Sequence, residues 1–314
     1  MAGPLTDAFA VVVVAAFAVG AAASMTDRER VTRHAFAVAW LLFAGFWAAL
    51  VPHFLFTKGS VIEGLLSFGA VPASAYVALL LYRGRGSLVT LSRGVTVMGL
   101  VYMPFQLSPA MARPLIDLAV GHTAWLIDLL GYEPTMVEGD TVGRELGLAN
   151  GFRFVIDGHG YVTEVVLACT GIGSIAIFAG LVAAVEAPLA RKAKALAVVL
   201  PVIYGLNIVR VGFIALAHGN QWFRYESAAG AVAWLMGVTG PEATNRVSWF
   251  IADRVIAQSL SVVALVAIAL FAVRVLPELV AVFEEVLYVA TGTEYDLAGS
   301  VGSERATDGG EPEE

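Results

Sequence analysis

The sequence contains one cysteine, Cys169, among 314 residues. This scarcity excludes an intramolecular disulfide and any cysteine-rich metal site. The histidines provide no metal motif either, because none of them is spaced as HxxxH or HxxH. They are His34, His53, His122, His159 and His218. We therefore expect neither a metal ion nor another cofactor.

Charged residues are scarce as well. They make up 14% of the chain, only three of them are lysines, and the net charge is −7. No basic patch indicates nucleic-acid binding, so no nucleic-acid partner is expected, and no phosphate loop or internal repeat stands out. An acidic balance with little lysine suits a halophile, although acidity alone is weak support for a source.

Apolar residues dominate the chain, at 58% with a mean hydropathy of +0.78. These values do not describe a soluble domain of this size. Seven stretches are long enough to cross about 30 Å of hydrocarbon, with a weaker candidate at 114–131. The seven are 8–24, 34–56, 61–82, 94–107, 162–184, 195–217 and 249–274. We predict an all-α polytopic membrane protein, about seven transmembrane helices plus one amphipathic or re-entrant outer helix.

Lysine and arginine in the short loops set the predicted orientation, because such loops are cytoplasmic. Three basic clusters occur, at 28–33, 83–93 and 191–194. With these inside, the N-terminus is outside, and residues 108–161 and 219–248 form outer loops that are candidates for a substrate cap. For the loops to alternate between the two sides in this way, 114–131 must not cross the membrane. We expect it to lie on or dip into the outer leaflet, which its charged residues favour.

The outer region also carries a small hairpin signal. Residues 151–166 read as two short strands around an Asp-Gly-His-Gly turn. The spans and their loops are predicted to form one transmembrane domain over residues 1–274. Residues 275–314 are predicted to be a polar cytoplasmic tail, disordered toward its acidic end.

Three spans each carry one reactive or charged residue at a similar depth below the outer face. Cys169 lies about seven residues into its span, or about 10 Å at 1.5 Å per residue. Arg210 and Arg254 lie about seven and five residues from the outer ends of theirs. A lone cysteine is more often a small buried hydrophobe. However, each arginine costs roughly 2.5–3.5 kcal/mol to insert, so the convergence predicts one active site.

These residue types fit thiolate catalysis. A thiol is mostly protonated at neutral pH and burial strengthens that preference, whereas an adjacent cation stabilises the thiolate. Arginine stays charged even when partly desolvated, and a second arginine can stabilise the oxyanion formed when a thiolate attacks a carbonyl. Gly171 and Gly173 follow the cysteine. They serve either close approach of backbone or substrate, or helix packing.

Three blocks resemble the signature blocks of the exosortase/archaeosortase family. They are Cys-Thr-Gly-Ile-Gly-Ser from Cys169, Asn-Ile-Val-Arg ending at Arg210, and Ala-Asp-Arg ending at Arg254. Bacterial members carry histidine in the third block, so arginine favours the archaeal branch. The resemblance implies Cys169 as nucleophile, with Arg210 and Arg254 as second and third members. Arg246 is a competitor for the third role.

The resemblance also implies a function. Members are transpeptidase-like protein-sorting enzymes that recognise a C-terminal signal of secreted surface proteins, namely a Pro-Gly-Phe motif, a hydrophobic helix and a basic tail. The thiolate attacks a backbone carbonyl near the motif, the helix departs, and a membrane lipid resolves the thioester. The orientation set by the basic loops places this cysteine protease/transpeptidase site on the extracellular side of the cell membrane.

Other polar residues near the cysteine are candidates for supporting roles. His159 and Glu164 lie above or beside Cys169, where either is placed to act as base or substrate contact. An exposed turn histidine is more often merely solvated. His218, at the outer end of its span, either assists proton transfer or is an ordinary interfacial polar residue.

Two further candidates lie near the arginines. Asn207 is one turn before Arg210 and either orients it or joins helices by hydrogen bonding. Gln258 is one turn after Arg254, which places it on the same helical face. Asp253 is adjacent to Arg254 in sequence, and we expect it to be the weaker partner because it points off that face.

A small-molecule or anion transporter is the main alternative, because intramembrane arginines also line anion pathways. Transporters show broken helices near the midplane and internal halves that resemble one another. Neither is clear in this sequence. A non-catalytic scaffold would leave two buried charges without purpose.

Overall fold

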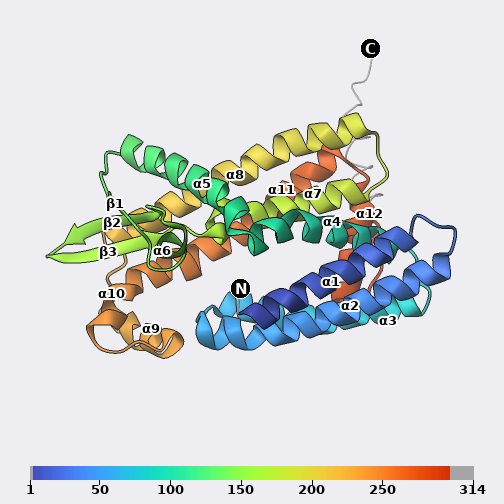
Figure 1. Ribbon diagram of the computed structural model, residues 1–314, viewed down its shortest axis with the longest axis horizontal. Helices are drawn as coiled ribbons and strands as arrows, with labels where there is room; N and C mark the ends of the chain where they lie inside the picture. Colours follow the sequence, from blue (N-terminus) through green and yellow to red (C-terminus); the bar gives the residue numbers. More distant parts are fainter. Residues whose placement is uncertain (1–2, 298–314) are drawn as a thin grey trace, which may run out of the picture.

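The computed structural model describes residues 3–297 as an elongated helical bundle with a small sheet at one end (Figure 1). Within this range, six helical segments are long and apolar enough to cross a membrane, and a seventh, α7 (Ile172–Ala184), is shorter. The six are α1 (Pro4–Ala23), α2 with its π-helical extension (Glu29–Thr57), α3 (Val61–Tyr82), α4 (Leu88–Leu107), α8 (Leu189–Gly219) and the continuous segment Pro241–Val275. The predicted all-α multi-pass class is confirmed.

The last of these segments contains three parts. They are α10 (Pro241–Trp249), a π-helical stretch (Phe250–Ala257) and α11 (Gln258–Val275). The weaker eighth candidate is α5 (Pro109–Leu129), which continues from α4 toward the sheet instead of returning along the bundle (Figure 1). The loops that carry the three basic clusters all lie at the opposite end from the sheet. This arrangement agrees with the predicted alternation of the spans.

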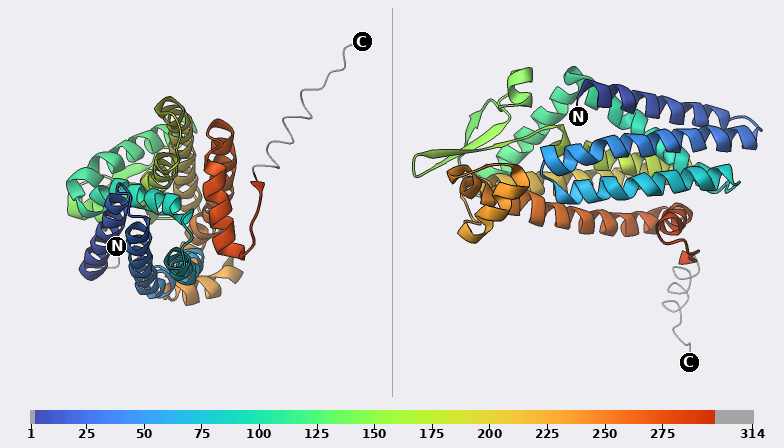
Figure 2. Two further views of the ribbon diagram at one scale, coloured as in Figure 1. Left: turned by 90° about the vertical axis from the view of Figure 1, so that its right-hand side faces the viewer. Right: turned by 90° about the horizontal axis from the view of Figure 1, so that it is seen from below.

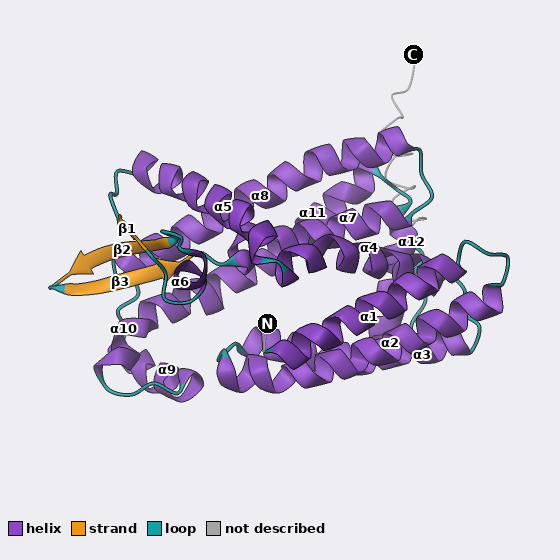
Figure 3. Cartoon of the chain, in the orientation of Figure 1, coloured by secondary structure: helices purple, strands orange, loops and turns teal. Residues whose placement is uncertain are grey.

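The predicted hairpin is confirmed. β2 (Gly151–Ile156) and β3 (His159–Glu164) pair antiparallel, and β1 (Thr135–Val137) adds a third strand beside β2 (Figure 3). The two-residue turn uses Asp157 and Gly158, both at positive φ (52° and 76°), as the tight hairpin turns require. Short helices α6 (Val142–Leu146) and α9 (Ala229–Met236) complete the same end of the molecule.

One predicted span is wrong at its start. The stretch 162–184 was expected to be helical throughout, but its first residues finish β3 and then form a 3-10 turn over Leu167–Thr170. α7 begins only at Ile172, after Gly171 in the left-handed conformation (φ 79°). The β-branched residues at 162–166 favour the strand, and the glycine permits the sharp change of direction. Cys169 therefore lies in the turn that precedes α7.

Close packing fixes α7 within the bundle. A Cβ atom on Gly180 of α7 would lie 2.4 Å from the carbonyl oxygen of Gly94 on α4, so the two backbones meet directly. Nearer the sheet, Phe152 of β2 and Val165 are fully buried against α5 and α8, and Cys169 packs at the edge of this cluster. The hairpin is thus anchored to the helix that carries Arg210.

The first part of the predicted tail, 275–314, is folded. Helix α12 (Leu279–Thr291) lies across the end of the bundle opposite the sheet (Figure 2). Arg85, on the α3–α4 loop, donates to Glu285 at 2.9 Å and stacks over Tyr288 at 3.5 Å. The predicted disorder toward the end of the chain concerns residues 298–314, which lie outside the described residues.

Candidate active site

The three residues predicted to form one site line one cavity of about 400 Å³, here called the thiol cavity. Each comes from a different part of the chain: Cys169 from the turn before α7, Arg210 from α8, and Arg254 from the π-helical stretch before α11. The cavity lies near the sheet end of the bundle. Sequence reasoning therefore placed these residues together correctly, while their catalytic roles stay predictions.

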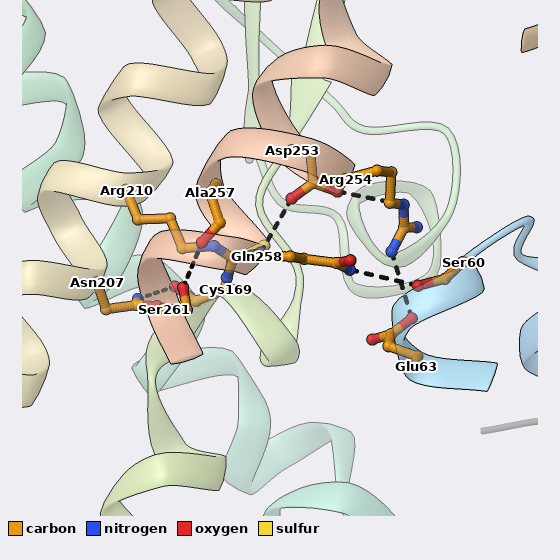
Figure 4. Close-up of polar contacts among 10 residues, drawn as sticks. All are labelled: Ser60, Glu63, Cys169, Asn207, Arg210, Asp253, Arg254, Ala257, Gln258 and Ser261. Atoms are coloured by element: carbon orange, nitrogen blue, oxygen red, sulfur yellow. Dashed lines mark hydrogen bonds and ion pairs between the residues drawn. The ribbon is translucent and has the colours of Figure 1, made fainter. Parts of the chain in front are cut away.

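The cysteine is held through its backbone. The Asn207 side-chain amide donates a hydrogen bond to the Cys169 carbonyl (Figure 4). A Cβ atom on Gly171 would sit 3.4 Å from Asn207, an ordinary contact, so glycine is favoured there by its positive φ of 79°. Gly173 has no such neighbour within 4 Å. Asn207 therefore orients the cysteine turn, whereas the sequence suggested that it orients the arginine or joins helices.

The electrostatic setting of the thiol differs from the simplest expectation. Burial raises the pKa of the Cys169 thiol, and this outweighs the opposing effect of the Arg210 guanidinium. One reason is that the nearby Asp253 carboxylate already neutralises the arginine and itself disfavours a thiolate. Burial and this carboxylate therefore both favour the thiol over the thiolate.

Asp253 joins the two arginines. Its Oδ1 accepts from Arg210 Nη2 at 2.9 Å, and its Oδ2 lies 3.5 Å from Arg254 Nε (Figure 4). As a partner of Arg254, Asp253 is more distant than Gln258, which agrees with the expectation. Its short contact crosses to Arg210 on α8, which the sequence analysis did not anticipate. Arg254 also pairs with Glu63 of α3 at 3.3 Å. Asp253 and Glu63 could each have been identified from the sequence, because each is a carboxylate inside an apolar span.

Gln258 contacts Arg254, as predicted from their spacing. With its amide oxygen facing the arginine, Gln258 accepts from Arg254 Nη1 at 3.0 Å and donates to the Arg254 carbonyl at 3.2 Å. With the amide reversed, its nitrogen donates to Ser60 at 3.3 Å. Trp249 lies under the same guanidinium, 5.1 Å from the ring centre. Arg254 is thus held on several sides and only 15% of its side chain is exposed.

Glu164 also lines the thiol cavity, but its oxygens are engaged elsewhere. They accept from Thr141 Oγ1 at 2.6 Å, the Gly143 amide at 3.0 Å and Asn150 Nδ2 at 3.2 Å. Burial raises the pKa of Glu164, but these hydrogen bonds together lower it by more. The net pKa is therefore below the ordinary value. The carboxylate is therefore ionised and anchors the loop before β2.

Changing Glu164 to glutamine is expected to destabilise the protein by about 1 kcal/mol at neutral pH, since partial exposure screens the carboxylate. Because the folded-state pKa is lowered, this contribution is full above the ordinary pKa of about 4.3 and is lost as pH falls through the folded value. Thermal unfolding between pH 3 and 7 measures it. Glu138→Gln, on an exposed carboxylate of the same loop, is the control. A deficit that persists at pH 3 would contradict this assignment.

His159 does not reach the thiol cavity. It lines a neighbouring cavity of about 640 Å³, here called the hairpin cavity, together with His218, Asn245 and Arg246. The His159 ring contacts Tyr161 edge-on at 4.7 Å, and its Nε2 lies 3.5 Å from Asn245. The structure thus separates this predicted supporting residue from the cysteine.

Arg246, the competitor of Arg254, lines both cavities. It pairs with Glu242 on its own helix at 2.7 Å, and 46% of its side chain is exposed. Arg254 is more buried and belongs to the network that includes Arg210. The geometry therefore links Arg254 to Arg210 through Asp253 and gives Arg246 a partner on its own helix.

The family model described as transmembrane exosortase matches residues 5–243. The chain belongs to the exosortase/archaeosortase family. It is similar to archaeosortase A of Haloferax volcanii, with 46% identity over 312 residues that cover 96% of this chain and 99% of the relative. Archaeosortase A of Natronomonas pharaonis is 45% identical over 286 residues, covering 91% and 89%. No solved structure matches the chain.

Membership of the exosortase/archaeosortase family confirms the resemblance drawn from the three sequence blocks. It makes the chain a multi-pass membrane protein and a membrane sorting enzyme of the protease/transpeptidase class. The family model includes Cys169 and Arg210 but ends before Arg246 and Arg254. The family match therefore does not decide between Arg246 and Arg254.

Proposed function

We propose that this exosortase/archaeosortase is a cysteine transpeptidase that cleaves the C-terminal sorting signal of secreted surface proteins and transfers the new C-terminus to a membrane lipid. The observation that supports it most is the gathering of the only cysteine and two arginines around one cavity. Each arginine is paired with a carboxylate. Such pairing suits fixed catalytic donors better than an anion pathway, so the transporter alternative is disfavoured.

In the proposed reaction the Cys169 sulfur attacks a backbone carbonyl of the substrate, and the thiol proton passes to the departing amine. Arg210 is the proposed oxyanion donor, because it lines the cavity with Cys169, 26% of its side chain is exposed, and Asp253 fixes its Nη2. The product of this step is a thioester on Cys169. A nucleophile on a membrane lipid then displaces the thiolate.

Asp253 and Glu63 support this chemistry by position. Together they hold two guanidinium groups in place without filling all their donor positions. Donors that are fixed before the reaction stabilise developing charge more effectively than mobile ones. The Asp253 carboxylate also limits the charge of the site, so that two arginines can share one partly desolvated pocket.

A third cavity, next to the thiol cavity, supports a membrane-embedded substrate. An apolar groove of about 370 Å³ begins at Asn207 and Arg210 and continues between α8 and α11 as far as Ile268. Because Arg210 lines this groove and the thiol cavity, a hydrophobic helix seated in it would present the adjoining peptide to Cys169. A C-terminal signal consisting of a short motif followed by an apolar helix fits this arrangement.

The proposed orientation places the thiol cavity on the extracellular side. The basic loops lie at the opposite end of the bundle from the sheet (Figure 1), whose strand β3 lines the cavity through Thr163 and Glu164. Basic loops favour the cytoplasm. Secreted proteins that are still held in the membrane by a C-terminal helix would meet the enzyme on that side.

Two variants test whether Arg254 or Arg246 fills the third catalytic role. Arg254→Gln is expected to lower the rate of signal cleavage by about 10²-fold, because it removes a buried cation next to Asp253. Arg246→Gln, at a more exposed position, is expected to cost less than tenfold. Rates of cleavage of one membrane-embedded substrate by both variants, with their expression levels matched, provide the comparison. The reverse order would assign the third role to Arg246.

The C-terminal chemical state of a surface protein tests the function as a whole. Mass spectrometry of that protein from cells with and without this chain is expected to show the intact C-terminal helix only in the deficient cells. In cells with the chain, the new C-terminus should carry the mass of a lipid. Identical C-termini would refute the sorting function, and a free truncated C-terminus would refute the lipid transfer alone.

A further inference from the structure

The thiol cavity and the hairpin cavity share a wall. Arg246 and Trp249 line both of them, one from each side. On the hairpin side the wall also carries His218, at the end of α8, and on the thiol side it carries Thr163 of β3. The two cavities are therefore separate volumes that are only one layer of side chains apart.

One hydrogen bond crosses this wall. Thr163 Oγ1 lies 3.0 Å from His218 Nδ1. Thr163 is buried, with 6% of the residue exposed, and its side chain borders the cavity that contains Cys169. His218 borders the other cavity and packs edge-on against the Tyr161 ring at 5.7 Å. A hydroxyl in contact with an imidazole in this manner can pass a proton from one side to the other.

Few other groups in the thiol cavity are free to accept a proton. Its carboxylates are Glu63, Glu164 and Asp253 among the described residues. Glu63 and Asp253 are paired with arginines, and Glu164 is engaged by the loop before β2. The lipid or water nucleophile that resolves a thioester carries a proton that must be removed. Thr163 is the buried hydroxyl of the cavity with an imidazole behind it.

We propose that Thr163 and His218 form a proton relay for the second half of the reaction, in which the acyl group leaves Cys169. This inference rests on the proposed function. As the nucleophile's oxygen or nitrogen bonds to the thioester carbon, its proton passes to Thr163 Oγ1, and the Thr163 proton passes to His218 Nδ1. The carbon–sulfur bond breaks, and Cys169 leaves as thiolate. The relay then returns a proton to the sulfur, so that no proton is gained or lost overall.

The surroundings of His218 suit transient rather than lasting protonation. His159 and Tyr161 face it from β3, and Arg246 faces the same cavity from α10 with its charge partly balanced by Glu242. A nearby guanidinium disfavours an imidazolium ion. A proton received from Thr163 is therefore released again, as a relay requires.

Single-turnover kinetics separate the two halves of the reaction. The assay uses the purified full-length chain in lipid nanodiscs with a synthetic peptide that spans a cleavage motif and its hydrophobic helix. Thr163→Val and His218→Gln are expected to form the Cys169 acyl-enzyme at close to the wild-type rate but to lose its resolution by about 10²- to 10⁴-fold. Hydroxylamine, which attacks thioesters without a general base, is expected to restore turnover in both variants.

Matched variants control for packing. Thr163→Ser keeps the hydroxyl and is expected to retain resolution of the acyl-enzyme. His122 of α5 makes a similar contact through Nδ1, to the Tyr204 hydroxyl at 2.7 Å, but lies outside both cavities, so His122→Gln should behave as wild type. A third test uses the wild-type enzyme and requires no substitution. Resolution of the acyl-enzyme is expected to be slower in D₂O than in H₂O, and this isotope effect should vanish when hydroxylamine is the nucleophile.

The outcomes distinguish the relay from the proposed function. Loss of acylation in both Thr163→Val and His218→Gln, without rescue by hydroxylamine, would overturn the relay. Resolution of the acyl-enzyme at the wild-type rate in these variants would also overturn it. So would the absence of a solvent isotope effect on this step in the wild-type enzyme. If Cys169→Ala cleaves the same peptide at the wild-type rate, the thiol mechanism itself fails.

Discussion

Replacing Cys169 with alanine is expected to abolish signal cleavage, with a loss of about 10⁴-fold or more, as found when a catalytic nucleophile is removed. The chain has no other thiol, so no neighbouring cysteine can substitute. Cys169 lies in a turn at the edge of a packed cluster and is only partly buried. Loss of one sulfur atom there should leave the bundle folded, so activity and stability are expected to respond separately.

The measurement for Cys169→Ala is the ratio of processed to unprocessed surface protein, together with the amount of enzyme in the membrane fraction. Wild-type enzyme levels with only unprocessed substrate are expected. Processing at more than a small fraction of the wild-type rate would show that another residue supplies the nucleophile.

The Arg210→Lys variant is expected to lose about 10²- to 10³-fold in kcat with a smaller change in KM. Arg210 donates from Nη2 to Asp253, and 26% of its side chain remains exposed where it lines the thiol cavity. Lysine carries the same charge, but its single ammonium group cannot hold the carboxylate and also present a second fixed donor. The charge of the cavity is kept in this variant, so the loss measures the geometry of the donors.

Arg113→Lys is the matched control for this test. Arg113 lies on α5, pairs with Asp117 at 3.8 Å and is half exposed, so its replacement should leave kcat unchanged. Full activity of Arg210→Lys would show that the site needs only a positive charge. Equal losses in both variants would indicate a general effect of arginine replacement on the protein.

Much of the architecture could be predicted from the sequence because the membrane imposes simple rules. Long apolar stretches identified the spans, and the basic residues at 28–33, 83–93 and 191–194 set their alternation. The Asp157–Gly158 turn between β-branched and aromatic residues identified the hairpin. Each of these signals is local, and each reflects the preference of a short segment for lipid, water or a tight turn.

The contacts that build the site are not local, and this is why they were harder to predict. Glu63 meets Arg254 across 191 positions of sequence, and Asp253 reaches Arg210 on another helix. The sequence analysis considered Asp253 only as a partner of Arg254 and did not anticipate its ion pair with Arg210. Similarly, the turn that holds Cys169 interrupts a stretch whose hydropathy alone resembles one continuous span. Tertiary packing decides these positions, and hydropathy does not report it.

Direct detection of the acyl-enzyme tests the central role of Cys169 most clearly. The purified enzyme is mixed with the signal peptide, quenched in acid within one turnover, and analysed by intact-mass and fragment mass spectrometry. Because Cys169 is the only cysteine, a thioester can form at that position alone. We predict a mass increase equal to the N-terminal cleavage fragment, localised to Cys169 and removed by hydroxylamine. Cleavage of the peptide without any such adduct would contradict thiol catalysis at this site.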